Sequence, residues 1–101
     1  MKEWTKEDWE HQQNENSIAA FYLYTPMCGT CAVATKMLEV VETMLPELPL
    51  GKANINYLEN LAMEYKVESV PCLLISNKGE VEKIYAFQSV PFLYDKLKKS
   101  S

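Results

Sequence analysis

Two cysteines, Cys28 and Cys31, are separated by Gly29 and Thr30 and carry the clearest chemistry in this sequence. Two thiols three positions apart can close into a disulfide and reopen reversibly, so the pair predicts redox chemistry. An apolar run over residues 18–24 precedes the pair, and a periodic helical pattern begins at Gly29. We therefore expect the pair at the junction between a strand and a helix.

The start of a helix gives the two sulfurs different roles. A thiolate, and not a thiol, attacks a disulfide. Cys28 should lie against unpaired backbone N–H groups and the positive end of the helix dipole, which lower the pKa of a thiol, so we predict that Cys28 is the nucleophile. Cys31 falls on the apolar stripe of the helix with Ala34 and Leu38. We predict that Cys31 is the shielded thiol that resolves a mixed disulfide.

Two other roles are open to a close cysteine pair. A structural crosslink over so short a loop gains only about 2 kcal/mol in the chain-entropy model, which favours a reactive pair. A zinc site would need further ligands, for which the sequence offers Cys72 and His11 but no second closely spaced cysteine pair. His11 stands among polar residues and is expected on the solvated surface. We therefore predict no metal and no organic cofactor.

Length, charge and hydropathy limit the remaining possibilities. The chain has 101 residues, which suits a single domain over residues 1–101. Its 10 basic and 14 acidic residues form no basic stripe, so nucleic-acid binding is not expected. No apolar run approaches the roughly 20 residues that a membrane helix needs, and the N-terminus opens no signal-peptide core. With only 3 cysteines, we expect a cytoplasmic monomer that does not bind membranes.

Apolar periodicity predicts the elements that position the cysteine pair. Helices are expected over residues 6–15, 29–45 and 58–65 and from Ser89 onward, and strands over residues 18–25, 50–56, 72–76 and 81–86. The last two strands are joined by a hairpin turn at residues 77–80. The polar strand 50–56 is placed near the edge of the sheet. Helices and strands in this order predict an α/β fold with a mixed sheet flanked by helices.

A CxxC pair at a strand-to-helix turn, followed later by Val70-Pro71, resembles the thioredoxin family. Residues 62–71 are similar to the family's approach to its cis-proline, and residues 52–56 resemble its central strand. The resemblance covers nearly the whole chain and implies the thioredoxin fold, a three-layer sandwich with a central mixed sheet of about four strands and four helices. Only four strands are expected because the family's N-terminal strand is reduced here to residues 2–4 at most.

The resemblance also implies a substrate groove beside the cysteines. In the family the bond before this proline is cis and faces the cysteine pair, so that the backbone of Val70 can pair with an extended substrate segment. Val70 and Pro71 are therefore predicted binding residues, together with Gly29, Thr30 and Met27. Met27 has the alternative role of an ordinary surface methionine.

The chain departs from the family at several positions. Thioredoxins usually have Trp before the first cysteine and Pro before the second, where this chain has Met27 and Thr30. The family's buried carboxylate aligns with Tyr22, so the usual proton acceptor for the resolving thiol is missing. A groove glycine aligns near Tyr85, and the proline that kinks the long helix aligns near Lys36, which predicts a straighter helix.

The resemblance implies a thiol-disulfide oxidoreductase of the small cytosolic bacterial type, which reduces or exchanges protein disulfides or mixed disulfides. Its partners would be disulfide-bearing client proteins, with a thioredoxin reductase or a low-molecular-weight thiol as electron donor. The alternative is a non-catalytic module of the same fold, in which the oxidation state of the pair controls partner binding beside Pro71. Thr30 offers a hydroxyl to a thiolate, which predicts a raised reduction potential.

Two further residues have open roles. Cys72 follows the expected cis-proline at the start of an apolar strand, which favours inert packing, with regulation by oxidation as the alternative. Lys52 either lends positive charge to the site or is simply solvated on its strand.

Overall fold

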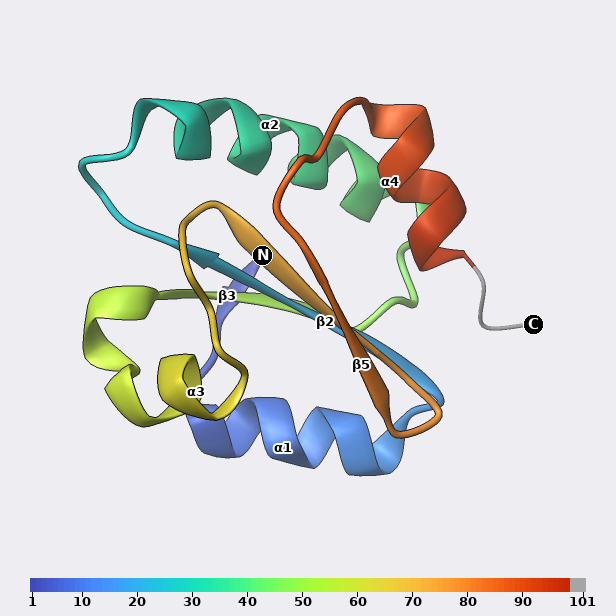
Figure 1. The fold of residues 1–101 in the computed structure, drawn as a ribbon. Helices are drawn as coiled ribbons and strands as arrows, with labels where there is room; N and C mark the ends of the chain where they lie inside the picture. Colours follow the sequence, from blue (N-terminus) through green and yellow to red (C-terminus); the bar gives the residue numbers. More distant parts are fainter. Residues whose placement is uncertain (99–101) are drawn as a thin grey trace.

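Five strands form one mixed sheet in a computed structural model, which describes residues 1–98 (Figure 1). Across the sheet the order is β1 (Lys2–Glu3), β3 (Leu50–Asn54), β2 (Ile18–Tyr24), β4 (Cys72–Asn77) and β5 (Glu80–Ile84). The strands β1, β3 and β2 are parallel, whereas β4 is antiparallel to β2 and β5 is antiparallel to β4. The predicted mixed sheet is confirmed.

Helices cover both faces of this sheet. Helices α1 (Lys6–Glu15) and α3 (Glu59–Glu64) lie on one face, and α2 (Gly29–Met44) and α4 (Val90–Leu97) lie on the other (Figure 1). This is the three-layer arrangement with four helices that the resemblance implied. Within residues 1–98, no helix is long and apolar enough to span a membrane.

Strand β2 is buried on both faces and divides the core into two clusters. Its side chains alternate, because successive residues of a strand point to opposite faces of the sheet. Ile18, Ala20 and Tyr22 pack toward α2 and α4, whereas Phe21 and Leu23 pack toward α1 and α3. Such double burial explains why the sequence of β2 is almost entirely apolar. The loop that carries the first cysteine leaves from the end of this buried strand.

The sheet has five strands, so the expectation of about four was wrong. Lys2 lies opposite Gly51 and Glu3 opposite Lys52, and the N–H of Trp4 donates to the carbonyl of Lys52 at 2.9 Å. The Trp4 ring covers Gly51, where a Cβ atom would collide with it. Two residues are too few to show a period of their own, and packing against β3 decides their conformation.

Strand β3 also differs from its prediction. It ends at Asn54 rather than at residue 56, and a short 3-10 helix η1 (Ile55–Tyr57) follows. The Asn54 side chain accepts a hydrogen bond from the N–H of Asn56 at 3.0 Å, which turns the chain out of the sheet. Because β1 is present, β3 is the second strand of the sheet, which agrees with its predicted place near the edge.

Candidate active site at the start of helix α2

Cys28 caps the N-terminus of α2 with its sulfur. The chain leaves β2 at Tyr24, crosses a short loop at the end of the sheet and enters α2 at Gly29 (Figure 1). The N–H of Cys31 donates to the Sγ atom of Cys28 at 3.1 Å. This bond satisfies one of the backbone donors that a helix leaves unpaired in its first turn. The sulfur of Cys28 therefore occupies the place of a capping side-chain oxygen.

The surroundings of Cys28 favour its thiolate. Its Sγ atom lies 3.2 Å from the Thr30 hydroxyl oxygen. Hydrogen bonding to the Cys31 thiol, then to the Thr30 hydroxyl, and also to backbone N–H groups of both residues lowers the pKa of the Cys28 thiol. Cys28 is half-buried and so remains open to a substrate. These features support its predicted role as the nucleophile.

Cys31 has the opposite environment. Its side chain is only 3% exposed and faces the layer between α2 and the sheet. Burial raises the pKa of the Cys31 thiol, and hydrogen bonding to Cys28 raises it further. The two thiols thus differ in pKa and in exposure, as the predicted roles of nucleophile and resolving thiol require.

The loop before β4 brings Val70 and Pro71 to the cysteines. The bond between these two residues is cis, as the resemblance implied. The Val70 carbonyl oxygen lies 4.0 Å from the Sγ atom of Cys28, although the residues are far apart in sequence. Both Val70 and Pro71 are half-buried. The structure therefore places the predicted groove residues beside the predicted nucleophile.

Two residues of the β5 edge hold this loop in place, and the sequence did not identify them in that role. The N–H of Glu68 donates to the Tyr85 hydroxyl at 3.2 Å. The Lys83 ammonium donates to the Lys66 carbonyl at 3.1 Å. Both contacts join residues 17 positions apart, and no local pattern in the sequence signals them.

Tyr22 lies under the first turn of α2. Its hydroxyl donates to the Cys31 carbonyl at 2.8 Å and lies 3.0 Å from the Thr35 hydroxyl oxygen. Its ring packs edge-on against Phe87, with centroids 6.0 Å apart. Burial is the main cause that raises the pKa of Tyr22 to about 12. Thr35 was not singled out in the sequence, although it stands one helical turn after Cys31 on the same face.

The family model of thioredoxin matches residues 1–98. The chain belongs to the thioredoxin family. Thioredoxin-family proteins are in general thiol-disulfide oxidoreductases that act with disulfide-bearing clients and reductants. The CxxC pair expected of such proteins is present here as Cys28 and Cys31, both as free thiols in this structure.

Individual relatives span most of the chain. It is 45% identical over 102 residues to the thioredoxin-like protein YusE of Bacillus subtilis, a match that covers 100% of this chain and 94% of the relative. It is 31% identical over 77 residues to a thioredoxin of Chlamydia pneumoniae, covering 75% and 76% of the two chains. The structure of mitochondrial thioredoxin 3 from Saccharomyces cerevisiae matches with a TM-score of 0.83 at 19% identity, covering 97% and 93%. The structural likeness shows the thioredoxin fold.

The other residues predicted for the thioredoxin site lie at its surface or away from it. Met27 is 95% exposed beside the nucleophile, and Gly29 and Thr30 are also exposed. The Lys52 ammonium lies 4.0 Å from a Glu3 carboxylate oxygen and 5.7 Å from the centroid of the Tyr24 ring. These partners account for Lys52 without a role in the site.

Cys72 lies on the other face of the sheet from Cys31. It stands opposite Leu23 and is fully buried in the cluster beneath α1 and α3. Burial raises the pKa of its thiol to about 11, which favours the packing interpretation over regulation by oxidation. His11 is exposed on α1, so the zinc ligands considered from the sequence do not come together. Residues 1–98 contain no group of three or more His, Cys, Asp or Glu side chains placed to hold a metal ion.

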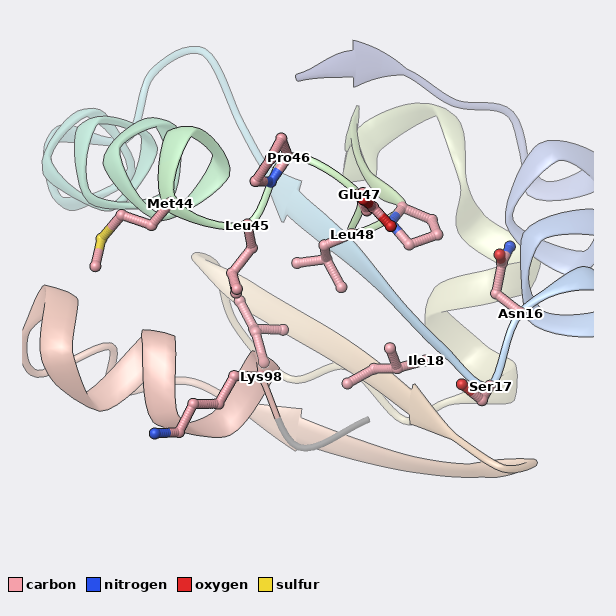
Figure 2. A pocket seen from close by; sticks show the side chains of 11 residues that line it. Asn16, Ser17, Ile18, Met44, Leu45, Pro46, Glu47, Leu48 and Lys98 are labelled. Atoms are coloured by element: carbon pink, nitrogen blue, oxygen red, sulfur yellow. The ribbon is translucent and has the colours of Figure 1, made fainter. Parts of the chain in front are cut away.

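A cavity of about 430 Å³ is lined by residues from the ends of three elements of the fold (Figure 2). It opens between the end of α2 at Met44, the start of β2 at Ile18 and the end of α4 at Lys98. Cys28 follows the far end of β2 and precedes the far end of α2. The cavity is therefore not part of the cysteine site.

Proposed function

We propose that this protein is a thiol-disulfide oxidoreductase that reduces or exchanges protein disulfides and mixed disulfides through Cys28 and Cys31. The observation that carries the proposal is the capping bond of 3.1 Å from the Cys31 N–H to the Cys28 sulfur, with the Cys31 thiol buried behind it. This arrangement stabilises a thiolate at the surface and keeps a second thiol within one helical turn.

The reaction has two exchange steps. The Cys28 thiolate attacks one sulfur of a client disulfide, a bond forms between Cys28 and that sulfur, and the second client sulfur leaves as a thiolate that takes a proton from solvent. Cys31 then loses its proton and attacks the Cys28 sulfur. The bond from Cys28 to the client breaks, the client leaves as a second thiolate, and the cysteine pair holds a disulfide. Two electrons have passed from the pair to the client.

Client binding is assigned to the loop beside the nucleophile. An extended client segment can pair with the backbone of Val70 in the manner of an added strand, which places its disulfide near the Cys28 sulfur. Met27 offers an exposed apolar side chain next to the attacking atom. Gly29 and Thr30 border the same surface, and Pro71 fixes the loop.

The oxidised pair must be reduced again before the next cycle. We assign this step to a thioredoxin reductase or a low-molecular-weight thiol, which returns two electrons to the disulfide. The reducing cytoplasm supplies such donors, and the protein is proposed to act there as a monomer without a metal or organic cofactor.

The test is reductase-coupled or dithiothreitol-coupled reduction of insulin by the whole chain. Cys28→Ser should abolish turnover while keeping the fold, because serine is itself a good helix cap. Cys72→Ala is the matched control, removes a thiol from the other face of the sheet and should leave turnover unchanged. Full activity of the Cys28→Ser chain would show that the mechanism is wrong. Strong redox-dependent binding of a partner without turnover would instead indicate the non-catalytic module.

A further inference from the structure

Tyr22 stands beside the resolving thiol in place of a carboxylate. Its side chain is fully buried, and its hydroxyl donates to the Cys31 carbonyl at 2.8 Å. A phenol has one proton to donate. The contact of 3.0 Å with Thr35 is therefore a bond in which Thr35 donates to the Tyr22 oxygen. The two hydroxyls form a short chain that ends on the first turn of α2.

No buried carboxylate is available to accept the proton of Cys31 within residues 1–98. No Asp or Glu side chain is buried within residues 1–98. When Cys31 attacks the mixed disulfide, its proton cannot go to a buried carboxylate. The hydroxyls of Tyr22 and Thr35 lie instead beside the backbone of Cys31.

The Tyr22 hydroxyl is suited to donate a hydrogen bond and not to accept the proton as a base. Burial raises the pKa of Tyr22 to about 12, so the phenol keeps its proton at neutral pH. Burial and the Cys28 thiol raise the pKa of the Cys31 thiol, whereas hydrogen bonding to the Thr25 backbone and, to a smaller extent, to the Tyr22 side chain lowers it. A hydrogen-bond donor stabilises a nearby thiolate without becoming charged itself.

We propose that Tyr22 is the positioning residue of the resolving step, which donates a hydrogen bond to the Cys31 thiolate while Thr35 orients its hydroxyl. This inference rests on the proposed function. Hydroxide or a buffer base from solvent removes the proton of Cys31, and the Tyr22 O–H turns from the Cys31 carbonyl toward the charged sulfur. That sulfur then bonds to Cys28, the bond from Cys28 to the client breaks, and the client thiolate takes a proton from solvent.

The first test measures the Cys31 thiol directly and needs no client. In a Cys28→Ser chain, the pH dependence of iodoacetamide alkylation at Cys31 is followed by mass spectrometry of the peptide. Adding Tyr22→Phe should raise the apparent pKa of Cys31 by about one unit, the scale expected for one lost hydrogen bond to a charged group. Tyr24→Phe is the matched control, because its hydroxyl binds the exposed Glu3 carboxylate at 2.8 Å and should cause no shift.

The second test follows decay of a preformed mixed disulfide between Cys28 and a small aromatic thiol by stopped-flow absorbance. With a thiol pKa one unit higher, the thiolate fraction falls tenfold while its nucleophilicity rises roughly threefold. Tyr22→Phe should therefore slow the step about threefold at neutral pH and speed it about threefold above the pKa of Cys31. Such a crossing of the two pH profiles is not expected from a purely structural defect, which slows the step at every pH.

Thr35 provides variants that leave the buried ring untouched. Thr35→Val should shift both profiles in the same direction as Tyr22→Phe but by less, and Thr35→Ser should restore the parent values. If Tyr22→Phe fails to fold, the comparison of Thr35→Val with Thr35→Ser tests the role of Tyr22. Profiles of Tyr22→Phe or Thr35→Val that match those of Tyr24→Phe would overturn the inference and leave the proposed function standing. A parent chain without insulin turnover would overturn the proposed function, and the alkylation shift would still be measurable.

Discussion

Cys31 and Cys72 are both removed from solvent, yet they lie on opposite faces of the sheet. Their side chains are 3% and 0% exposed, and burial is the main cause that raises the pKa of each thiol. Each also has a tyrosine whose hydroxyl lowers its pKa, Tyr22 for Cys31 and Tyr85 for Cys72. Burial and a tyrosine hydroxyl therefore act on the pKa of both thiols in the same directions.

The difference between them is the presence of a second, accessible sulfur. Cys31 stands one helical turn from Cys28, whose sulfur it contacts through its backbone N–H. Cys72 packs among Trp9, Leu61 and the other side chains of its cluster and has no thiol neighbour on its own face of the sheet within the described residues. A buried thiol becomes a resolving thiol only where a mixed disulfide can form beside it. Burial raises the pKa of both thiols, but only Cys31 lies beside a sulfur with which it can form a disulfide.

The largest effect is expected from removing Cys31, whereas removing Cys72 on the other face of the sheet should have none. Cys31→Ser leaves the Cys28 nucleophile without a resolving thiol, so a mixed disulfide with a client should persist for the minutes to hours typical of uncatalysed exchange. Cys72→Ala should show no accumulation. Non-reducing electrophoresis after mixing with a disulfide-bearing client distinguishes the two, and equal accumulation in both variants would show that the two faces are not distinct.

The second prediction concerns the effect of Thr30 on the reduction potential of the Cys28 and Cys31 pair. Its hydroxyl lies 3.2 Å from the Cys28 sulfur and favours the reduced, thiolate form. Thr30→Val removes the hydroxyl at nearly constant shape and should lower the potential by roughly 30 mV, a tenfold change in the equilibrium. Thr43→Val is a matched control on the exposed end of α2, where the hydroxyl binds the Val40 carbonyl. Equilibration with glutathione or dithiothreitol gives the values, and a parent potential as low as about −270 mV would contradict the role of Thr30.

Unfolding in alkali tests whether burial raises the pKa of the Cys72 thiol. The pKa of Cys72 is raised to about 11 in the fold, so the folded chain keeps a proton that the unfolded thiol releases near its ordinary pKa of roughly 8.5. Stability that is present below that ordinary value is lost as the pH rises toward 11. Between about pH 7.5 and 10, the free energy of unfolding should fall about 2 kcal/mol more in the parent than in Cys72→Ala.

Urea unfolding at both pH values gives this difference. Cys72→Ala should be the less stable chain at neutral pH, because it leaves a cavity, and the gap should narrow in alkali. Tyr22 titrates in both chains and cancels from the comparison. A gap that is constant with pH would mean that Cys72 ionises as readily in the fold as in the unfolded chain.

The reactive face was predictable from the sequence to a greater extent than the contacts that support it. The spacing of Cys28 and Cys31 and the apolar stripe of α2 are local patterns, and they predicted which thiol would be buried. The family resemblance added the cis bond at Pro71. The hydrogen bond of Tyr22 to the start of α2 depends on the packing of a helix on a strand, which no local period encodes.

The edges of the sheet were harder to predict for the same reason. Strand β1 has two residues and forms because Trp4 covers Gly51 on the neighbouring strand. The contacts of Tyr85 and Lys83 with the loop before β4 cross between segments that are distant in sequence. Pairings of this kind are decided by tertiary packing, so sequence patterns identify the elements better than the bonds between them.

The smallest expected effect concerns Tyr85, which packs against the Cys72 cluster and also contacts the loop before β4. Its hydroxyl accepts a hydrogen bond from the Glu68 N–H at 3.2 Å, and that loop continues to Val70 beside Cys28. Tyr85→Phe should raise the KM for a protein client about threefold and leave kcat nearly unchanged, since one exposed hydrogen bond is worth about 0.5 to 1 kcal/mol.

Tyr94→Phe, on α4, is the matched control, and its KM should equal that of the parent chain. Equal KM values for Tyr85→Phe and the parent would show that the loop keeps its position without the Glu68 bond. A fall in kcat with constant KM would instead place Tyr85 in the chemical step. The two faces of the sheet would then be coupled through that tyrosine, because its hydroxyl also acts on the thiol of Cys72.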